Sequence, residues 1–135
     1  MYAFASRTAG RLAGSVLLVV ATVCAAADYP ARPVRVIAPY APGGGVDFTS
    51  RVVTQKLAAA LGQTFVVDNR AGAASIIGTQ IVLNAQPDGY TLLWTDNAFN
   101  VNPLVFKDAK YDPLKDFETI ALIGSAPQML VGAMA

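Results

Sequence analysis

Histidine is absent from this 135-residue sequence, and cysteine occurs only once, at Cys24. Without histidine, the chain lacks the commonest general base and the commonest metal ligand. Cys24 lies in a segment that we expect to be removed, so the mature chain would have no catalytic thiol and no internal disulfide. No serine has a visible base beside it. Nothing in the sequence therefore stands out as a catalytic nucleophile or a metal ligand, and we expect no metal and no cofactor.

An excess of positive charge is also missing. Ten basic and nine acidic residues give the whole sequence a net charge of +1. Removal of residues 1–27 would take away Arg7 and Arg11 and leave a net charge of −1. Proteins that bind nucleic acid carry a basic face, so we expect no nucleic-acid partner.

Residues 1–27 have the pattern of a secretory signal peptide. Two arginines precede an apolar run at 14–23 that is too short to span a membrane. The alanines at 25–27 then supply the small residues of a cleavage site. We expect cleavage before Asp28 and export to the periplasm. The alternatives are an N-terminal membrane anchor and a lipoprotein attached through Cys24.

The most informative segment runs from residue 34 to residue 62. An apolar, β-branched run leads into Gly43, Gly44 and Gly45, and a helical pattern follows at once. A strand, a glycine loop and a helix in this order direct free backbone N–H groups towards a small anion. Asp47 stands at the start of the helix, where we expect it to be the N-cap that accepts from the N–H of Thr49 or Ser50.

Two familiar nucleotide-binding patterns fit this loop poorly. The Gly-Lys-Ser/Thr ending of a P-loop is absent. Phe48 occupies the third glycine position of a dinucleotide-binding fingerprint, although Asp68 stands about where a ribose-binding acid belongs. A carboxylate at Asp47 would also repel a pyrophosphate. Arg70, further along, could clamp a carboxylate or simply pair with Asp68.

The hydrophobic pattern predicts alternating strands and helices. We predict strands at 34–38, 64–67 and 90–95, helices at 48–61 and 75–84, a loop or short helix at 96–102, and strands near 119–124 and 128–131. The predicted buried helix faces are Val53, Leu57, Ala60 and Leu61 on the first helix and Ile77, Ile81 and Val82 on the second. This order predicts an α/β fold with a parallel sheet. Its ligand site should lie beyond the carboxyl ends of the strands, at the loops 42–47, 68–75 and 95–100.

Five motifs occur in order along the expected mature chain. They are YPARPVR at 29–35, APGGGVD at 41–47, LGQTFVVDNR at 61–70, PDGYTLL at 87–93, and NP at 102–103 followed by YDPLKDF at 111–117. Together they resemble the Bug (Bordetella uptake gene) family, the TctC-like periplasmic solute-binding proteins of tripartite tricarboxylate transporters. The resemblance covers essentially all the residues after the predicted leader.

The resemblance implies a two-lobed periplasmic binding protein of type II, or Venus-flytrap, architecture that closes on its ligand by a hinge. Family members are more than twice as long, so the chain is expected to be an incomplete, N-terminal piece. Residues 28–117 would form the first part of lobe 1, and residues 118–135 would begin the crossover into lobe 2.

The same resemblance implies a function in transport without chemistry. The protein would capture a small carboxylate and deliver it to membrane subunits of the transporter, and it would be a monomer when complete. The implied ligand-binding residues are Tyr40, Pro42, Gly43, Gly44, Gly45, Asp47, Thr95 and Asn97. The alternatives are a dinucleotide-binding lobe of an oxidoreductase and a nonfunctional truncated product.

One loop departs from the family pattern. The family's second loop usually reads Arg-Pro-Gly-Ala-Gly-Gly-Asn-Ile-Gly, whereas residues 70–78 read RAGAASIIG. Ile76 therefore stands where the family has asparagine, and a polar contact from that position is not expected here.

Overall fold

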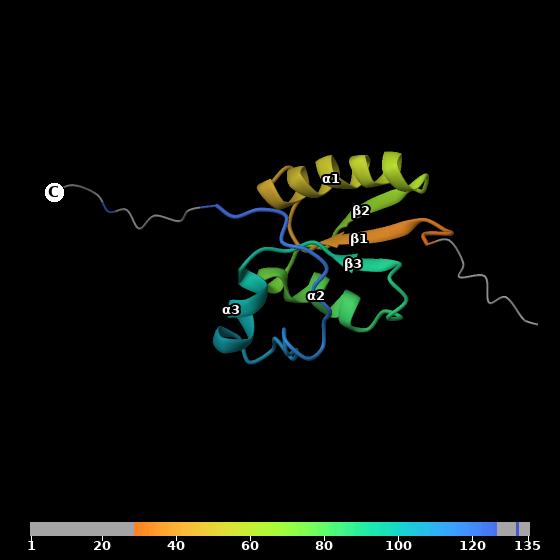
Figure 1. Cartoon of the computed structure of the whole chain (residues 1–135). Coiled ribbons are helices and arrows are strands. Elements are labelled where there is room, and N and C mark those ends of the chain that lie inside the picture. Colours follow the sequence, from red (N-terminus) through yellow and green to blue (C-terminus); the bar gives the residue numbers. More distant parts are fainter. Residues whose placement is uncertain (1–28, 127–131, 133–135) are drawn as a thin grey trace, which may run out of the picture.

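A parallel sheet of three strands forms the centre of the computed structural model, which describes residues 29–126 and residue 132. The strands are β1 (Val34–Ala38), β2 (Phe65–Asn69) and β3 (Thr91–Leu93), in the spatial order β2-β1-β3. Figure 1 shows helix α1 on one face of the sheet and helices α2 and α3 on the other. The predicted α/β fold with a parallel sheet is confirmed.

The central strand is β1, because its sequence is apolar on both faces. Val34, Val36, Ile37 and Ala38 are all buried, and only Arg35 is partly exposed. Val36 lies opposite Val67 of β2 and Leu92 of β3. A strand buried on both sides has this dense apolar composition instead of an alternating one. The bounds of β1 agree with the prediction, and β2 extends two residues further than expected.

Helix α1 spans Gly45–Leu61 and begins three residues earlier than predicted. It ends as expected at Gly62, whose φ of 66° allows its N–H to donate to Ala58 O. The prediction that Ala60 and Leu61 lie on the buried face is wrong, since both are exposed.

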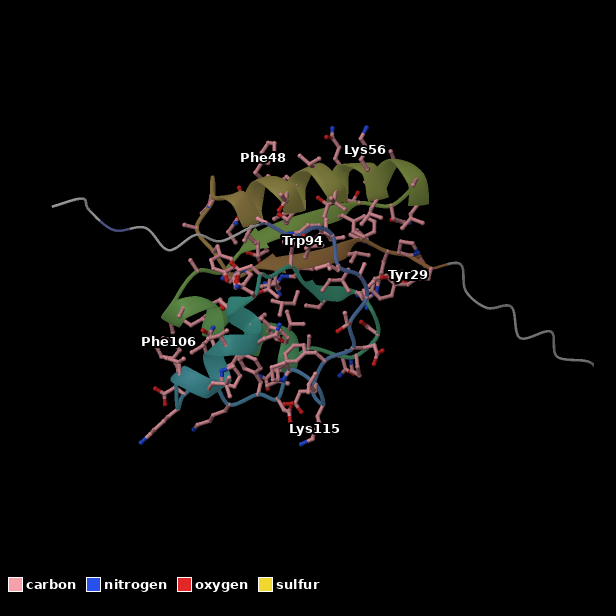
Figure 2. The ribbon with its side chains drawn as sticks, turned by 60° about the vertical axis from the view of Figure 1, so that its left-hand side comes forward. Tyr29, Phe48, Lys56, Trp94, Phe106 and Lys115 are labelled. Atoms are coloured by element: carbon pink, nitrogen blue, oxygen red, sulfur yellow. The ribbon has the colours of Figure 1, made fainter. Side chains whose placement is uncertain are left out.

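The most deeply buried positions of α1 are instead Asp47, Ser50 and Thr54. Ser50 Oγ donates to Asp47 O, and Thr54 Oγ1 donates to Arg51 O. Small hydroxyl side chains that bond to the preceding turn can be buried without an unpaired donor. These short side chains line the part of α1 that is buried, and Phe48 points outwards and is 67% exposed (Figure 2).

Helix α2 (Ile76–Leu83) follows a short 3-10 turn, η1 (Ala73–Ser75), and α3 (Ala98–Val105) follows β3. The prediction for Ile77 is wrong: it is 48% exposed, and Ile76 and Thr79 are buried in its place. The chain enters α2 through a left-handed turn, which turns Ile76 towards the core. Ile76 packs there with Ala109 and Tyr111.

Gly78 brings α2 close to the end of β1. A Cβ atom at this position would lie 2.6 Å from Pro39 Cβ and 3.0 Å from Arg70 O. Contacts that short do not occur between real atoms, so glycine is required for this packing. Helix α2 therefore packs closely against Pro39 and Arg70, the residues that follow β1 and β2.

The first described residues fasten the chain to the turn before β3. Tyr29 Oη donates to Gly89 O, and the Ala31 N–H donates to Tyr90 Oη. Arg32 pairs with Asp88 at 2.7 Å and lies 4.0 Å from the centre of the Tyr90 ring. An edge-to-face contact between the Tyr29 and Tyr90 rings, a cation–π contact and hydrogen bonds thus hold residues 29–32 in place.

The prediction of a strand near 119–124 is wrong, because these residues are extended but irregular and largely exposed. A β-strand needs a neighbouring strand for its backbone hydrogen bonds, and none lies alongside in the described part of the chain. The predicted strand at 128–131 and the predicted leader at 1–27 lie outside the described residues. No helix within 29–126 is long and apolar enough to cross a membrane.

Candidate functional site

The loops that follow β1, β2 and β3 meet at one end of the sheet (Figure 1). Together with the first turn of α1, they contain all eight residues that the sequence suggested as ligand-binding. The parallel arrangement causes this convergence, since every strand delivers its loop to the same edge. The contacts among these loops determine what the site can bind.

The glycine loop turns sharply and then opens into α1. Gly43 has a φ of 87°, which requires glycine, whereas Gly44 is the N-cap residue with φ −79° and ψ 171°. A Cβ atom would have open space at Gly45 and only an ordinary contact, 3.7 Å from Ala41 O, at Gly44. Pro42 and the three glycines are exposed.

The first N–H groups of α1 are available to a ligand. The N–H of Phe48 is the first to make an intrahelical bond, to Gly44 O. Within residues 29–126, the N–H groups of residues 44–47 donate to no other protein group. Unpaired donors at the start of a helix add to the positive end of the helix dipole. This end of α1 can therefore accept a small anion.

Asp47 is not the N-cap, and this prediction is wrong. Gly44 is the cap, and Asp47 is the third residue of α1, 5% exposed. Its Oδ2 accepts from the Gly43 N–H at 2.9 Å, and its Oδ1 accepts from Arg51 Nε and Asn69 Nδ2, each at 2.9 Å. The side chain reaches back to the loop because the helix starts earlier than the apolar pattern indicated.

These three contacts stabilise the ionised form of Asp47. The hydrogen bond from Arg51, followed by those from Gly43 and Asn69, lowers the pKa of the Asp47 carboxyl to about 2. Both carboxylate oxygens are already occupied, and Arg51 supplies a compensating charge. Asp47 therefore fixes the shape of the loop, and its charge is neutralised next to the helix start.

Asn69 joins β2 to this network, and the sequence did not single out its role. Its Nδ2 donates to Tyr40 O at 3.1 Å as well as to Asp47, and its Oδ1 accepts from Arg51 Nη2 at 2.8 Å. The sequence did contain a sign of this network. Arg51 lies four residues after Asp47, which is the spacing of an ion pair on a helix. The position of Asn69 two residues after the second apolar run was a further indication.

Tyr40 extends the network to the third strand. Its hydroxyl donates to Asp96 Oδ1 at 2.6 Å. Burial, together with the hydrogen bond to Asp96, raises the pKa of the Tyr40 hydroxyl to about 12. Asp96 Oδ1 also accepts from the Ala98 N–H at 2.9 Å and so caps the start of α3. The ends of all three strands are thus hydrogen-bonded to one another.

The other two predicted residues of the third loop behave differently. Thr95 Oγ1 is buried and has no hydrogen-bond partner among residues 29–126. Asn97 is exposed and makes no side-chain capping bond, although it precedes α3 directly. The structure brings Tyr40, Asp47 and the glycines together through the network, and it places Thr95 and Asn97 beside Asp96.

The second loop contains an unusual left-handed turn. Ala73, Ala74 and Ser75 have φ values of 46°, 52° and 76°. Non-glycine residues rarely adopt this region. Asn102, which is 4% exposed, donates from Nδ2 to Ala74 O and to Ser75 Oγ. A buried amide of α3 thus holds the turn in place.

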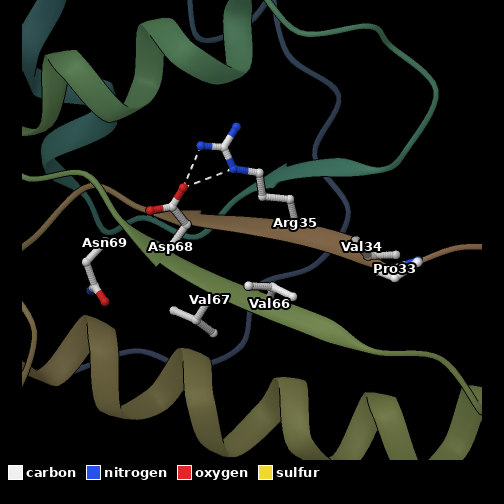
Figure 3. A pocket seen from close by; sticks show the side chains of 7 residues that line it. All are labelled: Pro33, Val34, Arg35, Val66, Val67, Asp68 and Asn69. Atoms are coloured by element: carbon white, nitrogen blue, oxygen red, sulfur yellow. Dashed lines mark hydrogen bonds and ion pairs between the residues drawn. The ribbon is translucent and has the colours of Figure 1, made fainter.

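Two grooves in the described part of the chain lie elsewhere. One, of about 400 Å³, runs along β1 and β2, where Arg35 pairs with Asp68 (Figure 3). The other, of about 690 Å³, lies between α1 and β2. Neither is lined by a predicted ligand-binding residue. Arg70 also pairs with Asp68, at 3.0 Å. This agrees with the second of the two roles suggested by the sequence, an ion pair with Asp68.

The sequence of this chain is similar to those of a known protein family. The family model described as "Tripartite tricarboxylate transporter family receptor" matches residues 49–135. A UPF0065 protein of Bordetella bronchiseptica is 42% identical over 125 residues, which cover 90% of this chain and 37% of that protein. The chain spans about a third of the length of the curated relatives it matches.

Two solved structures are similar. The periplasmic binding protein BugD has 41% sequence identity and a TM-score of 0.64, over 67% of this chain and 30% of its own. MatC from Rhodopseudomonas palustris, solved with bound malate, has 33% identity and a TM-score of 0.61, over 66% of this chain and 31% of its own. Both match this chain with about a third of their length.

Proposed function

Because this chain belongs to the tripartite tricarboxylate transporter receptor family, we propose that it forms part of a periplasmic solute-binding protein that captures a small carboxylate. The captured ligand would pass to membrane subunits of a tripartite tricarboxylate transporter. The start of α1 would hold a ligand carboxylate through the free N–H groups of residues 44–47, with Tyr40, Pro42, Gly43, Thr95 and Asn97 around it.

The observation that carries this proposal is the state of the first turn of α1. Its N–H groups at residues 44–47 have no partner in the described chain, and Asp47, the acidic side chain of that turn, has both oxygens occupied. A free carboxylate at Asp47 would repel an anionic ligand, but Arg51 neutralises it. The positive end of the helix is therefore left to attract the ligand.

The remaining parts of the proposal concern the chain as a whole. Residues 1–27 would direct export and be removed, and residues 28–117 would form the first part of one lobe. Residues 118–135 would lead into a second lobe, and the complete protein would act as a monomer. BugD is a periplasmic binding protein, and its similarity to this chain supports the periplasmic location.

The proposal can be tested in a hybrid protein that supplies the rest of a binding protein. In the hybrid, residues 29–126 of this chain replace the matching segment of the malate-bound relative MatC. We expect the hybrid to bind at least one compound in a calorimetric titration with small di- and tricarboxylates. A folded hybrid that binds none of them would contradict the proposed function.

The substitution Gly44→Val then tests whether the ligand carboxylate binds at the start of α1. The backbone angles of Gly44 suit a β-branched residue and the space around it is open, so the fold should be retained. The added methyl groups would shield the adjacent N–H groups and lower affinity about ten- to a hundredfold, or about 1.4–2.7 kcal/mol. Ala60→Val, a β-branched substitution at an exposed position in the last turn of α1, is the control and should bind normally. Unchanged affinity in a folded Gly44→Val hybrid would mean that this loop is only a turn.

A further inference from the structure

We propose that the outer edge of β2 binds an extended, acidic segment of another protein, which joins the sheet as an additional strand. This docking surface is separate from the start of α1, where the small carboxylate would bind. Unpaired backbone groups along β2, a groove on each of its faces and a positively charged cluster in one of the grooves point to such a partner.

Every second residue of β2 has its backbone groups free. β2 lies at the edge of the sheet, and its inner side pairs with β1. The Val34 N–H donates to Thr64 O, and the Arg70 N–H donates to Ala38 O. In a parallel pair with this register, the residues between those bonded to β1 direct their N–H and C=O groups outwards. These are residues 65, 67 and 69, and no strand within residues 29–126 lies along that side.

The sequence of β2 does not protect this edge against pairing. Edge strands often carry a proline, a lysine or a bulge that keeps other chains from adding to the sheet. β2 reads FVVDN and contains neither residue, and its register with β1 is continuous over all five positions. Its outward N–H and C=O groups are therefore available to an incoming strand.

The two grooves described above border β2 on its two faces. One is lined by Arg35 and Asp68, and the other, beside α1, is lined by Gln55 and Phe65. Val67 contributes to both grooves. Figure 3 shows Arg35 and Asp68 on the face away from α1 and Val67 on the face towards it. Because side chains alternate along a strand, an added strand would place them in the two grooves in turn.

The face away from α1 carries an excess of positive charge. Asp68 accepts from both Arg35 and Arg70, so two guanidinium groups share one carboxylate. Nη1 of Arg35 and both Nη atoms of Arg70 make no hydrogen bond among residues 29–126, and both side chains are partly exposed. An acidic side chain of the partner would find free donors and an opposite charge here.

The groove beside α1 favours uncharged side chains. Its one charged lining residue, Arg51, is paired with Asp47, and its other lining residues are neutral. The partner should therefore alternate acidic residues with apolar or neutral ones. A second copy of this chain fits less well. In an antiparallel pair of β2 strands, two positively charged clusters would lie on the same face of one sheet and repel each other.

Labelled peptides test the chemistry of the partner. One peptide alternates valine with glutamate, and a second alternates valine with lysine. In fluorescence-anisotropy titrations of the full chain, we expect the glutamate peptide to bind at least about tenfold more tightly. A third peptide is the glutamate peptide N-methylated at two neighbouring residues. It keeps its charge but loses an N–H that faces β2, whichever way it runs, and it should bind at least about tenfold more weakly.

The substitution Val67→Pro tests the strand itself. The Val67 N–H points outwards, so proline removes a donor from the free edge and none from the pairing with β1. Val67→Ala is the matched control, because it shortens the same side chain and keeps the N–H. We expect Val67→Pro to weaken binding of the glutamate peptide at least about tenfold, and Val67→Ala to weaken it no more than about twofold.

The substitution Arg70→Gln tests the charge and does not depend on the acceptance of a proline. Arg35 still pairs with Asp68 in this variant, so the fold should be retained. The preference for the glutamate peptide should fall to about threefold or less, because one of the two guanidinium groups is lost. Lys107→Gln removes an exposed positive charge elsewhere and should leave the preference unchanged.

Amide hydrogen exchange then locates the bound peptide. In the free chain, the N–H groups of residues 66, 68 and 70 should exchange slowly, and those of residues 65, 67 and 69 should exchange faster. The glutamate peptide should slow the second set. The same measurement on the hybrid with MatC shows whether the rest of a binding protein leaves this edge free, as we expect.

Several results would overturn the inference. They are no binding of the glutamate peptide up to about 1 mM, equal binding of the three peptides, and equal weakening by the two Val67 variants. Slow exchange at residues 65, 67 and 69 in the free hybrid would mean that another part of the protein covers the edge. A dimer that Val67→Pro abolishes would mean that a second copy occupies it. These results leave the proposed carboxylate binding at the start of α1 untouched.

Discussion

The carboxylate of Asp47 accepts hydrogen bonds from three groups: Gly43 and Arg51, each four residues away, and Asn69, 22 residues away. Each of these hydrogen bonds favours the ionised form of Asp47. The charge of Asp47 and the shape of the glycine loop therefore depend on one another. Capping had been predicted from the position of Asp47 next to the glycines. The spacing of Arg51 from Asp47 was visible in the sequence, but the bond from Asn69 was not, because Asn69 belongs to β2.

This dependence predicts a change in stability with pH. The pKa of Asp47 in the folded chain, about 2, lies below the value of about 3.9 expected in an unfolded chain. The ionised side chain therefore stabilises the fold above about pH 4, and its contribution is lost as the pH falls towards 2.

Comparison of the native chain with Asp47→Asn by urea unfolding isolates this contribution. The native chain should be the more stable of the two at pH 5, and the difference should narrow between pH 4 and pH 2. Asp68 and Asp112 also have lowered pKa values, but they are present in both proteins and cancel in the difference. A gap of the same size at pH 5 and pH 2 would show that the charge of Asp47 contributes nothing.

At the scale of elements, the alternation of strands and helices was predictable, and the faces of the helices were only partly so. The apolar run at residues 34–38 correctly predicted the bounds of β1, because a strand buried on both faces is apolar throughout. Gly62 correctly predicted the end of α1, because glycine readily adopts the left-handed conformation that ends a helix. The buried polar residues of α1 could not be found from hydrophobic spacing. The burial of Ile76 instead of Ile77 depends on the turn before α2, whose backbone angles the sequence does not suggest.

That turn also explains a departure from the family pattern. Ala74 and Ser75 stand at positions where the family usually has two glycines, and both have positive φ. Alanine in the left-handed region costs about 1–2 kcal/mol relative to the right-handed one. Asn102 offsets part of this cost through its bonds to the same two residues.

We therefore expect Ala74→Gly to stabilise the chain by about 1 kcal/mol, because glycine adopts positive φ without strain. Ala59→Gly, an identical change at an exposed position of α1, should destabilise it by about 0.5–1 kcal/mol. Urea unfolding of both variants at pH 7 measures the two effects. Destabilisation of similar size in both would mean that the turn at residues 73–75 is not strained.

At the scale of the whole molecule, the three-stranded parallel sheet brings the loops after its strands together at one end. The convergence of the three loops followed from the parallel order alone and could be predicted. The contacts between the loops could not, because partners such as Tyr40 and Asp96 lie 56 residues apart in the sequence.

The predicted leader ends directly before an ordered segment, since Tyr29 is already bonded to Gly89. We expect signal peptidase to cleave before Asp28, which leaves one residue ahead of this contact. Intact-mass measurement of periplasmic material should give the mass of a chain that starts at Asp28. A product that retains Cys24, or that carries lipid, would refute this processing.

The hydrogen bonds from Asp47 through Asn69 and Tyr40 to Asp96 have a consequence for the speed and entropy of capture. Loops that are bonded to one another do not have to be ordered when a ligand arrives, so little conformational freedom is lost on binding. The first encounter would then resemble docking onto a rigid template, and any slower rearrangement would occur outside these loops. Exchange broadening in NMR spectra should accordingly be weak for the amides of residues 40–47 and 94–98, with or without ligand.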